Sequence, residues 1–174
     1  MSELCDVYDK DRKYVGKKVE RDKVGTKKNE YQLIVHICIF NSKGELLIQN
    51  RNKTKSSWPN LWDITAGGGA VAGESSQEAI VRELYEELGI NIKLSDIRPR
   101  ITINFEYGFD DIYIIEKDIS INTLKLQHSE VSEVKWASLE NISTMIKNNE
   151  FMPYYEEYIS LLFAIRGKMG VLKE

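Results

Sequence analysis

Short runs of apolar and polar residues alternate along most of this chain. Two of them, 31–40 (YQLIVHICIF) and 45–51 (ELLIQNR), flank the turn NSKG and are predicted to form adjacent strands. Residues 31–40 are apolar on both alternating faces, which is typical of a strand that is covered on both sides. Two later β-rich runs, 97–107 and 110–119, are expected to pair across a turn at 108–110.

Smaller patterns add further strands. A hairpin with a central polar turn is predicted over residues 6–20, and a polar connector over 21–30 follows it. The short strand WDIT (62–65) runs into AGGGA, where consecutive glycines are not expected to extend a strand well but let a ligand approach the backbone closely. Residues 133–139 (EVKWASL) are predicted to form a strand that leads into a helix near Ser138.

One helix in the middle of the chain carries its own start and stop signals. Ser75 and Glu78 form a capping-box pattern, and Gly89 stands where a C-terminal glycine belongs. Apolar residues repeat every four positions and give this helix a core-facing stripe, formed by Ile80, Leu84 and Leu88. A second amphipathic helix is predicted over 153–168 (PYYEEYISLLFAIRGK).

These elements predict an α+β fold, an α/β/α sandwich in which helices cover a mixed sheet. The 174 residues are 42% hydrophobic and 29% charged, and the chain shows no internal repeat or Pro/Ser-rich linker. We therefore expect a single domain over 1–174, with an N-terminal hairpin extension over 1–30 and a C-terminal helix within 150–174.

Charge and cysteine usage narrow the class of protein. A net charge of −3 gives no sign of a nucleic-acid partner, and the longest apolar run is too short to span a membrane. The first twenty residues are too polar for a secretory signal, and Cys5 and Cys38 lack CxxC spacing. We expect a cytoplasmic protein with a reduced, buried Cys38, and with His36 as a core histidine.

The central helix raises a problem of charge. Glu83, Glu86 and Glu87 are neighbours on one side of it, away from the apolar stripe, and each like-charge pair costs about 0.2–0.5 kcal/mol. Arg82 can pair with one carboxylate, or with Glu78, but it cannot balance them all. Oxygen-rich clusters of this kind suit Mg²⁺ or Mn²⁺. A solvated acidic face fits the same spacing, so spacing alone leaves both interpretations open.

The wider pattern is more specific. Reading from Gly68, the order is Gly, five residues, Glu74, seven residues, Arg-Glu-Leu, one residue, Glu-Glu, one residue, Gly-Ile, which ends at Ile90. This segment resembles the complete Nudix box, and the likeness extends over about residues 30–150. The resemblance implies the Nudix fold, hydrolysis of a diphosphate linked to another moiety, and dependence on a divalent metal, Mg²⁺ or Mn²⁺.

The resemblance also implies a metal site on the helix. Glu83 and Glu87 are expected to be its main ligands, with Glu86 as a third or water-bridged ligand. The backbone carbonyl of Gly67 or Gly68 is expected to complete the set. The carboxylate repulsion would then be relieved by the cation and its polyanionic substrate.

Other residues receive catalytic roles from the same resemblance. Arg82 is expected to orient the glutamates, and Glu74 to support the loop or the metal's outer ligands. The general base of this family comes from the box or from a later loop. Glu130, six residues before Trp136, is our later-loop candidate, and a solvated loop acid is the alternative for that position.

A finer likeness joins the N-terminal part of the chain to the Nudix branch near isopentenyl-diphosphate isomerases. It rests on DVYD, on the loop RNKTKSSWPNLWD and on AGE. The isomerases need a cysteine and a metal-binding histidine where this chain has Gly67 and Gly69, so isomerase activity is not expected. In that branch, residues at the places of Arg51 and Lys55 contact the diphosphate, although ordinary surface charge would explain them too.

Together these observations predict a hydrolase of nucleoside di- or triphosphates or other nucleoside-diphosphate derivatives. Its partner would be a small-molecule nucleotide or diphosphate, with no nucleic acid and no membrane, and the chain would be a monomer or a homodimer. The alternatives are an isomerase-like enzyme of isoprenoid diphosphates, a non-catalytic nucleotide-binding Nudix module, and a scaffold that associates through its C-terminal helix.

Overall fold

The computed structural model describes residues 3–25, 28–94, 97–168, 170 and 172. The chain falls into two compact units. The first comprises Met1–His36, Gly67–Glu83 and Ile92–Tyr113, and the second comprises Ile37–Ala66, Leu84–Asn91 and Ile114–Glu174. Strand β3 (Gln32–Phe40), helix α1 (Ser76–Leu88) and strand β8 (Gly108–Glu116) contribute residues to both units, which are described separately below.

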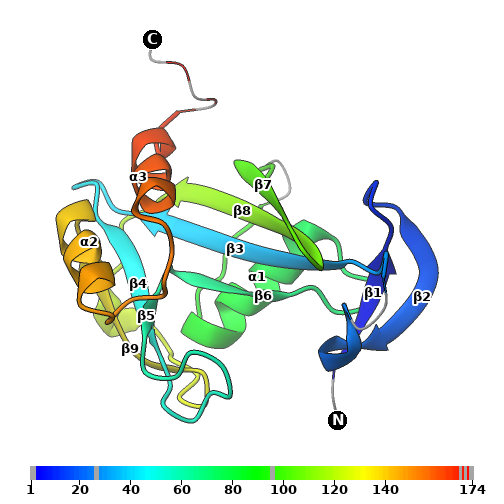
Figure 1. The fold of residues 1–174 in the computed structure, drawn as a ribbon. Helices are drawn as coiled ribbons and strands as arrows, with labels where there is room; N and C mark the ends of the chain where they lie inside the picture. The colour runs from blue at the N-terminus through cyan, green and yellow to red at the C-terminus, as the bar shows by residue number, and fades with distance from the viewer. Residues whose placement is uncertain (1–2, 26–27, 95–96, 169, 171, 173–174) are drawn as a thin grey trace. The chain divides into compact units, whose positions relative to one another are not determined.

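The first unit opens with the predicted hairpin. Strands β1 (Leu4–Tyr8) and β2 (Tyr14–Glu20) pair antiparallel, and the 3₁₀ helix η1 (Arg21–Lys23) follows them (Figure 1). The hairpin prediction is confirmed, while residues 26–27 of the predicted connector lie outside the described residues. The backbone N–H of Ala72 donates to the carbonyl of Leu4 over 2.8 Å, which fastens the hairpin to the segment just before α1.

The predicted pair of later strands is also present, with a shifted turn. Strands β7 (Ile101–Phe105) and β8 are antiparallel, and Phe105 lies opposite Gly108. The turn therefore falls at Glu106 and Tyr107, and the prediction of a turn at 108–110 was wrong. Gly108 belongs to the strand because it passes so close to the backbone of Gln32 that a side chain there would overlap its carbonyl.

The glycine run forms a strand, contrary to expectation. Strand β6 (Ala66–Gly69) pairs with β3, and just beyond it the N–H of Ala70 donates to the carbonyl of Leu33 over 2.9 Å. The predicted strand WDIT is reduced to β5 (Trp62–Asp63). Ladder hydrogen bonds to the neighbouring strand are backbone interactions, so they hold β6 extended without any contribution from its side chains.

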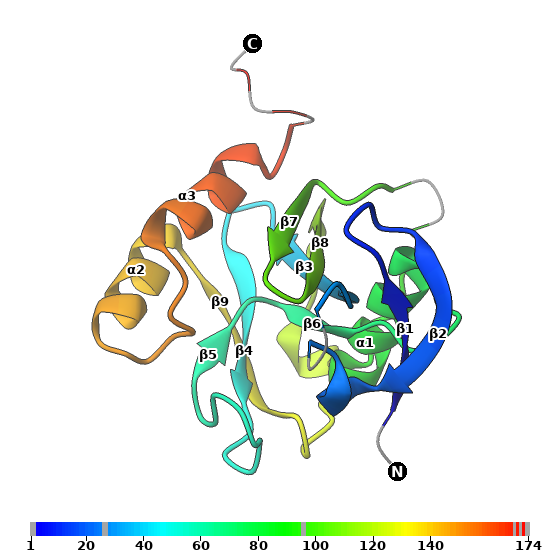
Figure 2. The same ribbon diagram turned by 45° about the vertical axis from the view of Figure 1, so that its right-hand side comes forward.

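The second unit contains the predicted hairpin partner and the helices that follow. Strand β4 (Leu46–Arg51) pairs antiparallel with β3, β5 and β9 (Val131–Ala137). The 3₁₀ helix η2 (Ile121–Thr123) precedes β9, and helices α2 (Leu139–Lys147) and α3 (Glu156–Ile165) follow it. Figure 2 shows α2 and α3 side by side. The predicted step from strand to helix near Ser138 is confirmed, and Ser138 caps α2.

Side chains on the two faces of β4 face different helices. The side chain of Gln49 reaches Glu87 at the end of α1, whereas Asn50, the next residue, lines a cavity of about 580 Å³ together with Met145 of α2. Successive side chains of a strand point to opposite faces. Helices therefore cover both faces of β4, in agreement with the predicted sandwich.

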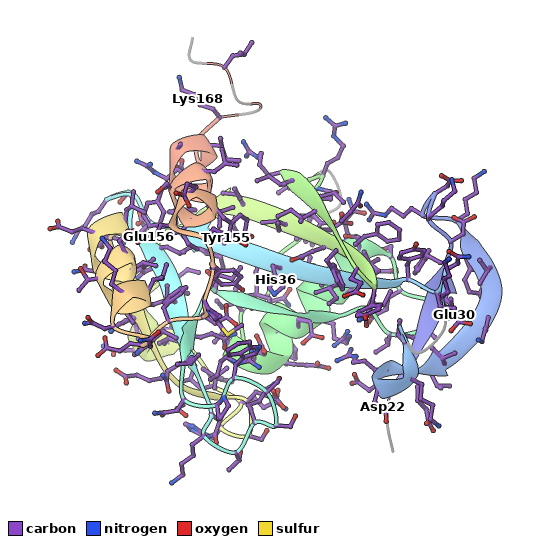
Figure 3. All side chains as sticks on the ribbon, viewed as in Figure 1. Asp22, Glu30, His36, Tyr155, Glu156 and Lys168 are labelled. Atoms are coloured by element: carbon purple, nitrogen blue, oxygen red, sulfur yellow. The ribbon has the colours of Figure 1, made fainter. Side chains whose placement is uncertain are left out.

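Helix ends agree with their sequence signals more closely in α1 than in α3. The Ser75–Glu78 capping box is formed, and Gly89 adopts a φ of +68° directly after α1. Helix α3 is shorter than the predicted 153–168, since it begins only after Tyr155 (Figure 3) and ends at Ile165. Residues 169, 171, 173 and 174 of the predicted C-terminal segment lie outside the described residues.

Candidate functional site

The acidic face of α1 is less exposed than its sequence predicts. Glu83 and Glu87 are 8% and 6% exposed, while Glu86 points to solvent. The prediction that all three lie away from the core was wrong for Glu83 and Glu87. These two side chains stand one helical turn apart on a continuous helix, so α1 holds two buried carboxylates on one side. Burying charges in this way is costly unless they are paired or bind a metal ion.

The middle glycine of β6 makes room for one of these carboxylates. A Cβ at Gly68 would overlap both carboxylate oxygens and the carboxyl carbon of Glu83. The carboxylate of Glu83 therefore lies directly against the backbone of β6 at Gly68, which is the first residue of the box. A glycine at position 68 is needed for this arrangement, because any other residue would push the carboxylate away.

The glycine before it accommodates a histidine from β3. A Cβ at Gly67 would overlap the imidazole ring of His36, whose Nδ1 lies 2.8 Å from Oδ1 of Asp110 (His36 is labelled in Figure 3). His36 is thus packed on β6 and held by a carboxylate, and it is only partly buried. The neighbouring Asp111 is fully buried and receives bonds from Arg12 and Thr102. Both aspartates belong to β8.

The third glycine accommodates an arginine from the N-terminal segment. A Cβ at Gly69 would lie 2.9 Å from the guanidinium of Arg21, whose Nη2 donates to the carbonyl of Gly69 over 2.6 Å. Arg82 donates to the same carbonyl over 3.1 Å. Each glycine of the run therefore leaves space for one ionisable side chain from a different element. The need for this space explains the three consecutive glycines. Because successive residues of a strand point to opposite faces, His36 and Arg21 lie on one face of β6 and Glu83 lies on the other.

Arg82 connects the loop to the helix. Its Nε and Nη2 donate to the two carboxylate oxygens of Glu74 over 2.7 and 3.0 Å, and its Nη1 donates to Glu83 over 3.0 Å. Glu74 in turn accepts from the N–H of Val71 over 2.9 Å. These hydrogen bonds, above all the one with Glu74, raise the pKa of Arg82 above its ordinary value. Arg82 therefore pairs with Glu74 and Glu83, and not with Glu78.

The basic loop of the second unit is organised by Arg51. Its guanidinium donates to the carbonyls of Ser57 and Trp58 over 3.0 and 3.1 Å, and it lies 3.4 Å from a carboxylate oxygen of Asp63. The side chain is only 17% exposed. Arg51 therefore holds the shape of its own loop, a role that its position in the sequence did not suggest.

Lys55 and Glu130 form an ion pair. The loops that carry them are joined by the N–H of Asn52, which donates to the carbonyl of Glu130 over 2.8 Å. The Glu130 loop is also tied to α1, because the N–H of Gln127 donates to the carbonyl of Glu87 over 2.9 Å. Two predicted site residues thus lie together, next to a segment that is bonded to the end of the glutamate helix.

The donor set of α1 fits a hard divalent cation. Carboxylate oxygens are the ligands that Mg²⁺ and Mn²⁺ prefer, and one of the two buried carboxylates, Glu83, lies close against the backbone of β6 at Gly68. Within the described part of the chain, no three His, Cys, Asp or Glu side chains are gathered as ready-made metal ligands. Glu83 is bonded to Arg82, so its carboxylate would have to turn toward a metal ion.

Comparison with known proteins identifies the family. A family model described as the NUDIX domain matches residues 30–158. The chain belongs to the Nudix family. An uncharacterised Nudix hydrolase of Listeria innocua is 44% identical over 138 residues, which are 79% of this chain and 80% of that protein. An isopentenyl-diphosphate Δ-isomerase of Salmonella arizonae is 31% identical over 112 residues, which are 60% of each chain.

Solved structures agree with this Nudix assignment. The chain is similar to the crystal structure of DR0079 from Deinococcus radiodurans, with a TM-score of 0.70 and 25% identity over 86% of this chain and 91% of that chain. The predicted α+β Nudix fold is confirmed, and the protein is a Nudix hydrolase. Nudix hydrolases typically act on nucleoside-diphosphate derivatives and generally use divalent cations. Among the described residues, no helix is long and apolar enough to cross a membrane.

Three polar residues beside these elements were not found from the sequence. The sequence pattern assigns His36 to the core and gives no role to Arg21 or Gln49. Arg21 and His36 pack against glycines of β6, and Gln49 donates a hydrogen bond to Glu87. The three consecutive glycines were the available signal for His36 and Arg21, because the space left by each absent side chain must be filled by a side chain from another element. No comparable signal marked Gln49.

Proposed function

We propose that this Nudix hydrolase cleaves the diphosphate linkage of nucleoside di- or triphosphates, or of other nucleoside-diphosphate derivatives, with Mg²⁺ or Mn²⁺ as its cofactor. The observation that carries the proposal is the pair of buried carboxylates, Glu83 and Glu87, one turn apart within an intact Nudix box. Arg82 supplies one positive charge there and shares it with Glu74. A divalent cation beside these carboxylates would offset the remaining charge.

Metal binding is assigned to a small set of residues. Glu83 and Glu87 would be the main ligands, Glu86 a third or water-bridged ligand, and the carbonyl of Gly67 the backbone ligand. When bound, the metal neutralises the diphosphate oxygens and acidifies the attacking water. Arg82 holds Glu83 and Glu74 beside the site through hydrogen bonds of 2.7 to 3.0 Å, and the carboxylate of Glu83 would turn from Arg82 toward the metal ion.

Glu130 is our proposed general base. Its carboxylate would accept the proton of the water that attacks phosphorus while the phosphorus–oxygen bond of the anhydride breaks. Two features support this role: its loop is bonded to the carbonyl of Glu87, and Lys55 faces its carboxylate. Lys55 would shift toward the diphosphate when substrate arrives. Arg51 would act on the diphosphate through the loop that it shapes.

The side chains packed against the glycines of β6 argue against isomerase chemistry. A cysteine at position 67 would collide with His36, and a histidine at position 69 would collide with Arg21. The likeness to an isopentenyl-diphosphate isomerase supports a substrate that carries a diphosphate. A non-catalytic nucleotide-binding module is the second candidate function, but such a module has no need of every charged residue of the box, all of which are present here.

The proposal is tested with a substrate panel. Purified protein is incubated with Mg²⁺ or Mn²⁺ and with nucleoside di- and triphosphates, ADP-ribose, NADH, dinucleoside polyphosphates and isopentenyl diphosphate, and products are identified by mass spectrometry. We expect metal-dependent cleavage of at least one nucleotide. A ligand that raises thermal stability without being cleaved would identify a binding module instead.

Two variants control this experiment. Glu87→Gln removes a metal ligand and is expected to abolish most turnover while the protein stays folded, because repulsion on α1 is relieved. Glu140→Gln makes the same change at an exposed position of α2 and should keep full activity. Full activity of Glu87→Gln would refute the metal site. Analytical ultracentrifugation of the same samples separates the monomer from the homodimer.

A further inference from the structure

Gln49 places an amide against the glutamate helix. It stands on β4, is 4% exposed, and donates through Nε2 to Oε2 of Glu87 over 3.1 Å. Its carbonyl oxygen, Oε1, is buried, and among the described residues no group donates a hydrogen bond to it. Buried polar atoms are nearly always hydrogen-bonded, and those that are not require an explanation.

The orientation of this amide is fixed by charge. If the amide were turned over, Oε1 would face the carboxylate of Glu87, and two acceptors would meet without a proton between them. The amide nitrogen must therefore point to Glu87, and Oε1 must point elsewhere. Asn50, the next residue, does not share this situation, because its Nδ2 donates to the carbonyl of Asn60 on the other face of β4.

We propose that Gln49 is a positioning residue of the metal site, which holds Glu87 through Nε2 and accepts a hydrogen bond from a metal-bound water through Oε1. Mg²⁺ and Mn²⁺ keep several water molecules when they bind to carboxylates, and those waters are strong donors. A residue that orients a metal-bound carboxylate typically changes metal affinity 10- to 100-fold when it is removed. This role rests on the proposed function, since it requires a metal ion at Glu87.

The test measures metal binding and not turnover. Mn²⁺ is titrated into the full-length protein, with bound metal followed by calorimetry and free metal by electron paramagnetic resonance. Gln49→Met keeps the length of the side chain and removes both polar atoms. We expect its dissociation constant for Mn²⁺ to rise about tenfold or more. The melting temperature of the metal-free variant reports the structural effect separately, because Gln49→Met removes an unsatisfied buried acceptor and also the hydrogen bond to Glu87.

A matched control lies next to it. Asn50→Ala removes a buried amide from the same strand, and should lower the melting temperature while leaving the Mn²⁺ dissociation constant unchanged. Gln49→Leu serves if the methionine variant does not fold. The double variant Gln49→Met with Glu87→Gln should lose less Mn²⁺ affinity than the sum of the losses in the two single variants, because Gln49 acts in part through that carboxylate.

The possible failures are distinct. Wild-type affinity for Mn²⁺ in Gln49→Met would overturn the role of Gln49 and leave the metal site intact. Equal weakening in Asn50→Ala would also overturn it, because the effect would then belong to the strand. Absence of Mn²⁺ binding by the wild-type protein would overturn the proposed function and this role together.

Discussion

The carboxylate of Glu83 lies against the backbone of Gly68, in the volume that a side chain at position 68 would fill. This contact joins the first glycine of the Nudix box to one of its glutamates across a gap of fourteen residues. The spacing of the box therefore has a steric basis as well as a chemical one. Strand and helix approach closely enough for a backbone and a carboxylate to touch.

Replacing Gly68 with alanine should displace this carboxylate. The added methyl group overlaps Glu83, and relief of such overlap typically costs about 1–3 kcal/mol of stability. We expect Gly68→Ala to bind Mn²⁺ at least tenfold more weakly, as measured by calorimetry. Gly167→Ala is the control, because its methyl group would meet only the end of the flexible Glu116 side chain, at 3.3 Å. Unchanged metal affinity in Gly68→Ala would contradict this prediction.

Substituting Arg82 with lysine should weaken both the fold and catalysis. A single ammonium group cannot bond to Glu74 through two nitrogens while it also serves Glu83. Hydrogen bonds to charged groups contribute about 1.5–3 kcal/mol each, so we expect urea unfolding to show a loss of about that size for Arg82→Lys. The same substitution at the exposed Arg98 should change the free energy of unfolding by less than about 0.5 kcal/mol.

Variants of the Glu130–Lys55 ion pair should affect stability and catalysis to different degrees. Both side chains are partly exposed, so a double-mutant cycle with Glu130→Gln and Lys55→Met should give a coupling energy below about 1 kcal/mol in unfolding experiments. If Glu130 is the base, kcat of Glu130→Gln should nevertheless fall about 100-fold or more. A kcat within twofold of the wild-type value would return Glu130 to the role of an ordinary loop acid.

Acid should weaken the start of α1 through Glu78. Its carboxylate accepts hydrogen bonds from the backbone and the hydroxyl of Ser75, which lower its pKa below 4.5. A lowered pKa means that the stabilisation is complete above pH 4.5 and is lost as the pH falls through the folded-state value. The stability difference between the wild type and Glu78→Gln should therefore be present at pH 7 and shrink below pH 4, as denaturant unfolding at several pH values would show.

Local patterns predicted most elements because their causes are local. The Ser75–Glu78 cap, the left-handed Gly89 and the apolar stripe of α1 depend on residues within a few positions of one another. The hairpin over 6–20 and the strand–helix step at Ser138 were predicted for the same reason. Where the prediction failed, as at the β7–β8 turn, a neighbouring strand decided the outcome, since Gly108 is pressed against Gln32.

The sequence by itself determined that this protein carries a complete Nudix box, because family membership is a matter of residue types and spacing. Only the tertiary structure decided which side chains pack against the residues of the box. Burial of Glu83 and Glu87, the packing of His36 and Arg21 on glycines of β6, and the amide of Gln49 against Glu87 join residues that are distant along the chain. The sequence pattern does not name the partners in these contacts, because they meet only when strands and helices pack against one another.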